Sequence, residues 1–420
     1  MRILWIVNTI FPEPSKALGL SAPVSGGWMY SSAKQLSKAR EVKLAIATTY
    51  SGTELKLLSI EGIDYYLLPC KNKIKYDTKL EQHWEKVCAQ FLPDLVHIHG
   101  TEYAHGLACM RKIPSLRYVI SIQGLVSIIA RTYFAGIGVF EIIKNITIRD
   151  VLLFDTIFHQ KIRFIRRGIF EQQYIKTTKH VIGRTDWDYA QTKAINPFVK
   201  YHFCNDILRY SFYNSSKWDL NIKNENTIFL SQAAYPIKGI HQVIKAIFLL
   251  KNDFPNIKLR VAGLNIFETV NLISKIKLTG YALYVRKLIK KYELKNMIEF
   301  VGSLSEQEMC QEYLNSHIFI SPSSIENGGN SLGEAQLLGV PVIASYVGGI
   351  PDSIINNISG LFYPFEEVEM LAENIRKIFT DAKLAKSLSE NGIIAAEKRH
   401  DQIVNLQQTI YIYNTIIKQE

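Results

Sequence analysis

Short apolar runs alternate with longer segments of helical periodicity along this chain, and the series starts again near its middle. Strands that alternate with helices are typical of parallel sheets covered by helices on both faces. The sequence therefore predicts an α/β protein with two Rossmann-like, doubly wound domains. The predicted strands are 3–7, 42–47, 65–68, 95–98, 118–122 and 181–182 in the first series, and 228–230, 258–262, 298–301, 317–320 and 342–344 in the second.

Two further segments bear on the domain organisation. The polar segment 211–219 precedes the second series and is the predicted linker. The segment 402–418 has apolar residues at helical spacing, so the predicted helix must bury one face. This face consists of Ile403, Leu406, Ile410, Tyr413 and Ile417. A length of 420 residues exceeds one ordinary core and agrees with two domains.

Two glutamates, Glu326 and Glu334, lie on either side of the turn between the predicted strand 317–320 and the helix after it. Gly328 and Gly329 lie between them and lack a Cβ, so a ligand can approach the main chain there. The next residue, Asn330, is of a type that caps helices. The sequence therefore predicts a ligand site where this helix begins.

A helix N-terminus favours a phosphate, and we expect the N–H groups of Ser331 and Leu332 to face one. Glu334, expected in the first helical turn, could accept hydrogen bonds from a ribose diol. Glu326 is then left to reach the sugar. Alternatively, Glu334 only improves helix capping and Glu326 is an ordinary loop carboxylate.

A second strand-to-helix turn lies upstream, where Lys238 and Gly239 open an amphipathic helix. A lysine at this place could neutralise a diphosphate. The match at two separate turns favours a site for a sugar nucleotide.

Together with Gly26–Gly27, Asp94–His99 and Val347–Asp352, these two turns resemble the retaining glycosyltransferases of family four. That family has the GT-B fold, in which two Rossmann-like domains face each other across a cleft, and many members build bacterial surface polysaccharides. The resemblance implies transfer of a sugar, with retained configuration, from a nucleotide-sugar donor to a saccharide or polyprenyl-diphosphate-linked acceptor. The expected mechanism proceeds on one face of the sugar without a metal, and the nucleotide-diphosphate sugar is a co-substrate, with no cofactor.

The resemblance also implies the domain roles and the site residues. An acceptor-binding domain would span 1–210 and a donor-binding domain 211–400, with a C-terminal helix 401–420 that joins the first domain or, alternatively, packs on the second. The implied catalytic residues are Glu326 and Lys238. Donor-binding residues would be Gly26, Gly27, Gln232, Lys238, Asn330, Ser331, Leu332 and Glu334, and acceptor-side residues His99, Glu102, Gln123 and Arg184.

Two residues depart from the family pattern. Gln232 stands where an arginine commonly accompanies the lysine, and Gln123 stands where a histidine is often found. A glutamine can hydrogen-bond a sugar but cannot act as a base. The alternative function is therefore a non-catalytic relative that binds a sugar nucleotide or partners another transferase.

Other residues suggest a metal without completing a site. His97 and His99 alternate along one strand and point to one face, as metal ligands can, but no matching cluster of further ligands is evident. Asp186 and Asp188 open a predicted helix, where aspartates act as caps. Arg184 is a candidate for an acidic acceptor group, or for a surface ion pair.

The net charge of +11 is moderate and spread along the chain, but basic residues are dense in one segment, 158–170. Its residues Phe158, Ile162, Ile165 and Ile169 share a helical face with basic residues beside it. Such a helix can lie on an anionic membrane surface, or it can pack in the core with its charges solvated. We see no nucleic-acid recognition module and expect no nucleic-acid partner.

Five scattered cysteines without a Cys-x-x-Cys pair predict neither disulfides nor a zinc site. The chain begins with a predicted strand instead of a signal peptide, and no apolar run is long enough to span a bilayer. We therefore expect a cytoplasmic protein that, at most, contacts the inner face of the cell membrane.

Overall fold

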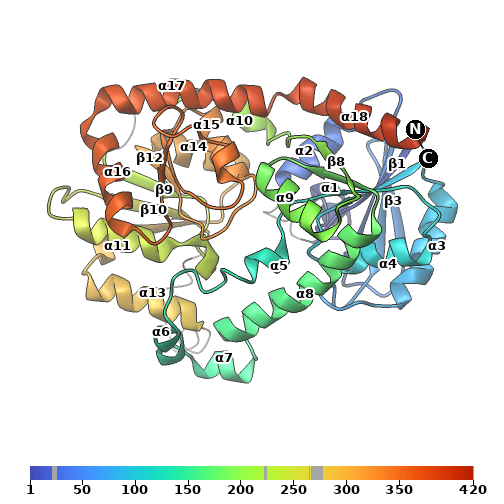
Figure 1. Ribbon diagram of the computed structural model, residues 1–420, viewed down its shortest axis with the longest axis horizontal. Coiled ribbons are helices and arrows are strands. Elements are labelled where there is room, and N and C mark those ends of the chain that lie inside the picture. The colour runs from blue at the N-terminus through green and yellow to red at the C-terminus, as the bar shows by residue number, and fades with distance from the viewer. Residues whose placement is uncertain (21–25, 222–224, 264, 266–277, 420) are drawn as a thin grey trace. The chain divides into compact units, whose positions relative to one another are not determined.

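The structure is a computed structural model that describes all residues except 21–25, 222–224, 264, 266–277 and 420. The chain forms two compact units (Figure 1). Unit 1 comprises residues 1–128, 164–208 and 400–420. Unit 2 comprises residues 129–163 and 209–399.

Unit 1 is built on an eight-stranded sheet in the order β3-β4-β2-β1-β5-β6-β7-β8, parallel except for the β3–β4 pair. Apolar residues fill both faces, with Leu4 and Ile6 on one side of β1 and Ile3 and Trp5 on the other. The strands are β1 (Arg2–Ile6), β2 (Lys43–Tyr50), β3 (Lys56–Ile60), β4 (Ile63–Pro69), β5 (Leu95–His99), β6 (Tyr118–Ser121), β7 (His180–Gly183) and β8 (Lys200–Phe203). The helices are α1 (Pro12–Ala17), α2 (Gly27–Leu36), α3 (Lys79–Phe91), α4 (His105–Lys112), α5 (Val126–Ile129), α9 (Asp186–Ile195) and α18 (Gln402–Gln419), while α8 (Ile157–Thr177) runs from unit 2 into unit 1.

Unit 2 has a fully parallel six-stranded sheet in the order β11-β10-β9-β12-β13-β14. Its strands are β9 (Thr227–Leu230), β10 (Lys258–Ala262), β11 (Ile298–Gly302), β12 (Ile318–Ser321), β13 (Val342–Ser345) and β14 (Leu361–Tyr363). Its α-helices are α6 (Val139–Lys144), α7 (Ile148–Leu152), α10 (Tyr210–Asn214), α11 (Ile240–Leu250), α13 (Gly280–Lys291), α14 (Glu306–Asn315), α15 (Asn330–Leu337), α16 (Val368–Thr380) and α17 (Ala382–Arg399). Short 3₁₀ turns η1 (Pro236–Lys238), η2 (Lys295–Met297) and η3 (Ile350–Asp352) connect some of these elements.

The α/β class with two doubly wound sheets is confirmed, and every strand expected from the sequence is present within a few residues. The prediction that residues 211–219 form a linker between the domains is wrong. This segment overlaps α10 and packs within unit 2, where the buried Trp218 donates a 2.8 Å hydrogen bond from Nε1 to the carbonyl of Ser316.

Residues 129–163 also differ from the expected domain 1–210, because they fold with unit 2. The buried His241 donates from Nε2 to the carbonyl of Ala135 over 2.8 Å. Asp150 accepts a 2.7 Å bond from the amide of Gly280. These contacts join segments far apart in the sequence, so local periodicity does not reveal them.

Helix α18 packs within unit 1. The hydroxyl of Tyr413 accepts a 3.0 Å hydrogen bond from Trp5 Nε1 and lies 2.5 Å from Nδ1 of His97. Leu406, Ile410 and Ile417 are partly buried beside it. The predicted buried face is wrong at its first turn, where Ile403 is exposed.

Candidate active site

Lys238 and Glu326 meet at the carboxyl edge of the unit 2 sheet. The strand order changes direction between β9 and β12, which are paired neighbours, and ligands of such sheets bind at this switch point. Lys238 follows β9 and Glu326 follows β12. Lys238 Nζ donates to Glu326 Oε2 over 2.8 Å, and Ser323 Oγ donates to the same oxygen over 3.2 Å. The two residues predicted to be catalytic are thus brought together.

Two glycines allow these loops to approach so closely. Gly239 has a φ of +68°, and a Cβ on it would lie 1.7 Å from the carbonyl oxygen of Pro322. Gly348 has a φ of +53°, and a Cβ there would lie 2.0 Å from the carbonyl oxygen of Glu326. The amide of Gly349 donates to that same oxygen over 3.0 Å. The loops after β9, β12 and β13 therefore hold the backbone around Glu326.

Helix α15 begins at Asn330, and the residue before it, Gly329, has a φ of +54°. Asn330 Oδ1 is buried and meets no hydrogen-bond donor among the described residues. The expectation that the amide of Leu332 faces a ligand is wrong, because this amide donates to the carbonyl of Gly329 over 2.8 Å. The carbonyl of Ser331 accepts a 3.0 Å bond from the hydroxyl of Tyr313. Asn330 and Ser331 thus lie at the helix start as predicted, whereas Leu332 is already part of its first hydrogen-bonded turn.

Glu334 lies beyond the first turn of α15, so its expected place in that turn is also wrong. Its carboxylate is buried and binds Arg209 through two parallel bonds, Nε to Oε1 and Nη2 to Oε2, each 2.7 Å long. Burial raises the pKa of Glu334 above its usual value, although the charge of Arg209 acts in the opposite direction. Because each carboxylate oxygen can accept more than one hydrogen bond, the pair leaves acceptor capacity for a ligand hydroxyl.

Gln232 is exposed in the loop that follows β9. Its amide cannot supply the positive charge that the family pattern has at this place.

Unit 1 has its own switch point between β1 and β5. Asn8, after β1, donates from Nδ2 to Oε2 of Glu102, after β5, over 2.8 Å. A Cβ on Gly100 would lie 2.1 Å from this carboxylate oxygen, so the glycine makes room for Glu102. Burial raises the pKa of Glu102. The predicted acceptor-side residue Glu102 therefore lies at the ligand-binding edge of this sheet.

Gly26 and Gly27 begin helix α2, with Gly26 at the N-cap and a φ of +87°. A Cβ on Gly26 would come within 2.9 Å of Thr9 Cγ2, so a larger residue would be strained both by this contact and by the positive φ. The helix starts one residue before the predicted Trp28.

His99 is buried at the end of β5, and its ring centroid lies 4.1 Å from that of Trp5 and 3.8 Å from that of His97. Neither ring nitrogen of His99 has a hydrogen-bond partner within the described part of the chain. Burial lowers the pKa of His99 to about 3, so the ring is neutral. A small cavity of about 50 Å³ lies beside it, lined by residues such as Trp28, Ser121 and Asn205.

Gln123 and Arg184 are close together, because Arg184 Nη2 donates to the carbonyl of Gln123 over 3.3 Å. Gln123 also donates from Nε2 to the sulfur of Met29 over 3.2 Å. The guanidinium of Arg184 is mostly buried and forms an ion pair with Asp206. Of the two roles predicted for Arg184, the ion pair is present, although it is not a surface pair. The N-cap of α9 is Thr185, which accepts from the amide of Asp188. The carboxylate of Asp188 in turn accepts from the amide of Arg184 over 3.1 Å, so Asp188 takes part in the capping predicted for the aspartates.

Sequence analysis missed three cations near these sites. Arg209 is one, and it lies 125 positions before Glu334. The other two, in unit 1, are Lys73 and Arg167, which lie 4.4 and 4.7 Å from the ring centroid of Tyr103. Arg167 also donates to the carbonyl of Glu102 over 2.7 Å. Arg167 belongs to the basic segment 158–170, but no motif connects any of the three residues with these sites, so only the fold reveals their place.

Comparison with known proteins identifies the family of one part of unit 2. Residues 213–394 match the family model described as glycosyl transferases group 1. These residues form a group 1 glycosyltransferase domain. The capsular polysaccharide biosynthesis glycosyltransferase CapM of Staphylococcus aureus is 28% identical over 182 residues, which are 43% of this chain and 44% of CapM. The chain thus spans half or less of the length of the curated relatives it matches.

Two solved structures extend the likeness to the whole chain. Sucrose-phosphate synthase from Thermosynechococcus elongatus superposes with a TM-score of 0.76 over 100% of both chains at 16% identity. Anabaena HepE in complex with UDP and glucose superposes with a TM-score of 0.67 over 99% of both chains at 14% identity. At these identities the likeness establishes the fold alone. The GT-B fold named from the sequence is confirmed, and so is the glycosyltransferase family of the group 1 domain.

Proposed function

We propose that the protein transfers a sugar from a nucleotide-diphosphate-sugar donor to a saccharide acceptor, with unit 2 binding the donor and unit 1 the acceptor. The observation that carries this proposal is the convergence of Lys238 and Glu326 at the switch point of the group 1 domain. The diphosphate would lie near Lys238 and the start of α15, and Glu334 would accept from a ribose hydroxyl. The structure of HepE with UDP and glucose, in a protein of the same fold, supports this kind of donor.

The proposed reaction retains the configuration of the sugar. The bond between the anomeric carbon and the diphosphate oxygen breaks, and the acceptor oxygen forms its bond to that carbon on the same face. The acceptor proton passes to the departing diphosphate oxygen, so no side chain needs to act as base. Lys238 stabilises the charge that develops on the diphosphate, and Glu326 positions the sugar by accepting from its hydroxyls.

The acceptor would be a saccharide or one linked to a polyprenyl diphosphate. Lys73 and Arg167 beside Tyr103 support an anionic group on the acceptor, because both cations are close to the ligand-binding edge of unit 1. We expect transfer in polysaccharide biosynthesis, as the name of CapM states for that relative.

Contact with the inner face of a membrane would suit a lipid-linked acceptor. Helix α8 supports it, because Ile162, Ile165 and Ile169 are exposed, as the membrane interpretation of segment 158–170 requires. No described helix is long and apolar enough to cross a bilayer.

A second candidate function is sugar-nucleotide binding without catalysis. The exposed Gln232 favours it, because one cation of the family pattern is absent from the loop after β9. In that case the chain would bind a nucleotide sugar or support another transferase.

Calorimetric titration with UDP, GDP and ADP, followed by a mass-spectrometric screen of donors and lipid-linked acceptors, tests the proposal. We expect micromolar nucleotide binding and turnover with one donor. Lys238→Ala and Glu326→Gln should each lower turnover about 100-fold or more. The matched pair Lys386→Ala and Glu390→Gln, which removes an exposed ion pair on α17, should have no effect.

The outcomes separate the candidates. Binding without turnover of any donor would favour the non-catalytic function. Wild-type turnover in a folded Lys238→Ala variant would remove this lysine from the mechanism.

A further inference from the structure

Unit 2 exposes a dense group of large apolar side chains on the segment that contains α6 and α7. We call residues 139–154 the α6–α7 surface. Soluble proteins rarely expose so many neighbouring apolar side chains without a partner. The exposed fractions are 48% for Val139, 88% for Phe140, 54% for Ile143, 80% for Ile148, 56% for Val151, 72% for Leu152, 61% for Leu153 and 71% for Phe154.

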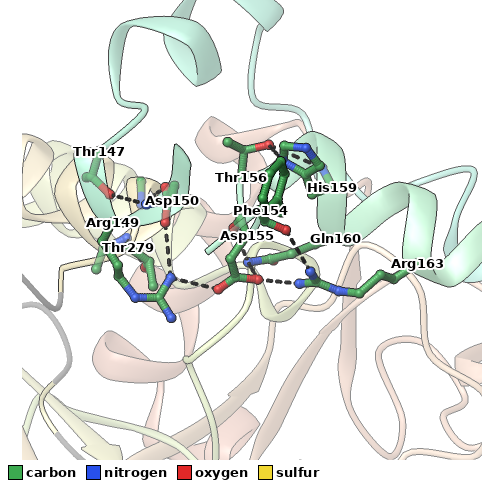
Figure 2. Close-up of polar contacts among 12 residues, drawn as sticks. Thr147, Arg149, Asp150, Phe154, Asp155, Thr156, His159, Gln160, Arg163 and Thr279 are labelled. Atoms are coloured by element: carbon green, nitrogen blue, oxygen red, sulfur yellow. Dashed lines mark hydrogen bonds and ion pairs between the residues drawn. The ribbon is translucent and has the colours of Figure 1, made fainter. Parts of the chain in front are cut away.

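A polar network holds this segment in place (Figure 2). The hydroxyl of Thr147 caps α7 by accepting from the amide of Asp150. Arg149 Nη1 bridges Asp150 and Asp155 at 3.1 and 2.7 Å, and Arg163 forms an ion pair with Asp155. Arg149 and Asp150 of the segment are therefore held in ion pairs, whereas Glu141 and Lys144 of α6 are exposed together with the apolar side chains.

The segment is also fixed to α13. Asp150 Oδ2 accepts from the amide of Gly280 over 2.7 Å, and a Cβ on Gly280 would lie 2.7 Å from the carbonyl oxygen of Asn145. Helices α6 and α13 lie side by side in unit 2 (Figure 1). The apolar side chains are thus presented on an anchored backbone.

Helix α13, which packs against α6, adds a group of basic residues to this part of unit 2. It carries four cations and no acidic residue. All four cations are exposed, namely Arg286, Lys287, Lys290 and Lys291. Lys144 is also exposed at the end of α6. Apolar side chains beside a cationic face are the pattern by which proteins bind anionic lipid surfaces.

We propose that the α6–α7 surface inserts its apolar side chains into the interfacial layer of an anionic bilayer, while the α13 cations contact the lipid headgroups. This inference rests on the membrane contact included in the proposed function and is independent of sugar transfer. A second copy of the chain fits less well, because a symmetric contact would bring two sets of α13 cations to the rim of one interface. An anionic bilayer satisfies both the apolar and the basic part.

Vesicle flotation with the full chain tests this inference. We would compare vesicles of phosphatidylcholine alone with vesicles that contain about 30% phosphatidylglycerol, since anionic lipid should strengthen binding. The double variant Phe140→Ser with Leu152→Ser should bind anionic vesicles at least about tenfold more weakly, because two large apolar groups no longer leave water. The matched control is Phe198→Ser with Ile394→Ser, which changes two other exposed apolar residues.

A second variant tests the basic part. Lys287→Glu with Lys290→Glu should remove the preference for anionic vesicles. All the substituted side chains are exposed, and thermal unfolding checks that each variant folds.

Three results would overturn the inference. The wild-type chain could fail to bind either vesicle, the Phe140 and Leu152 double variant could bind like wild type, or sedimentation without lipid could show that this variant converts a dimer to a monomer. Nucleotide titration is measured separately, so a wild-type chain that binds nucleotide but neither kind of vesicle refutes this inference and leaves the donor site standing.

Discussion

The buried pair of Arg209 and Glu334 gives a sharp prediction for the substitution Arg209→Met. Methionine keeps the length and apolar stem of the side chain but removes both 2.7 Å bonds to the carboxylate. Removing one partner of a buried ion pair leaves the other charge uncompensated and costs about 3–5 kcal/mol. Since the side chain of Glu334 is only 7% exposed, water cannot replace the guanidinium, and we expect unit 2 to lose about this much unfolding free energy at pH 7.5.

The loss should depend on pH. Burial already raises the pKa of Glu334, and removal of Arg209 raises it further. A carboxyl whose folded pKa lies above its unfolded value stabilises the fold in its protonated form, and this contribution disappears as pH rises through the folded pKa. The deficit of Arg209→Met should therefore be largest at pH 7.5 and shrink towards pH 5.

Urea unfolding with hydrogen exchange of α15 measures the free energy in unit 2 itself. A double-mutant cycle with Glu334→Gln isolates the pair, and we expect a coupling of about 2–3 kcal/mol. If the two substitutions are additive within about 0.5 kcal/mol, or if the deficit does not change with pH, the carboxylate is not held by this cation and the reasoning fails.

Three further predictions concern other residues. Gly239→Ala should destabilise unit 2 by more than about 1 kcal/mol in thermal unfolding and weaken nucleotide binding, because the φ of Gly239 is +68° and the added Cβ meets Pro322. Equal stability of the variant and the wild-type chain would contradict this. Gln232→Arg should tighten nucleotide diphosphate binding about tenfold in calorimetry, since the arginine can form a charged hydrogen bond with the diphosphate. Unchanged affinity would show that this loop does not reach the diphosphate. Burial raises the pKa of Glu171 to about 7, so the unfolding free energy of unit 1 should fall as pH rises through about 7. Glu171→Gln should abolish this pH dependence in urea unfolding between pH 5 and pH 8.

The sequence predicted the buried strands of both sheets because continuous apolar runs record burial directly. It missed β3, β8 and β14, which lie at the sheet edges. The burial of β3 alternates between intermediate and exposed positions, and β14 has only three residues, so neither produces a strong apolar run. Edge strands carry less of this signal because one side of each strand has no neighbour.

The site could be predicted where its residues are close in sequence. Lys238 and Glu326 each follow a strand, and the strands pair, so local motifs and the switch-point rule suffice. Arg209 and the position of residues 129–163 depend on contacts between distant segments. The Leu332 amide was misjudged because Gly329, at a φ of +54°, lets the helix close its first turn one residue earlier than the pattern suggested.

The two switch points differ in a way that bears on the proposed division of substrates. In unit 2 the polar pair is a lysine with a carboxylate, so a bound diphosphate can compete for a cation that is already at the edge. In unit 1 the pair is an amide with a carboxyl whose pKa is raised, and its cations, Lys73 and Arg167, stand beside Tyr103. A central pair without a cation suits sugar hydroxyls, and the cations at its side suit an anionic group. The chemistry of each edge thus supports a donor diphosphate in unit 2 and a hydroxyl-rich acceptor in unit 1.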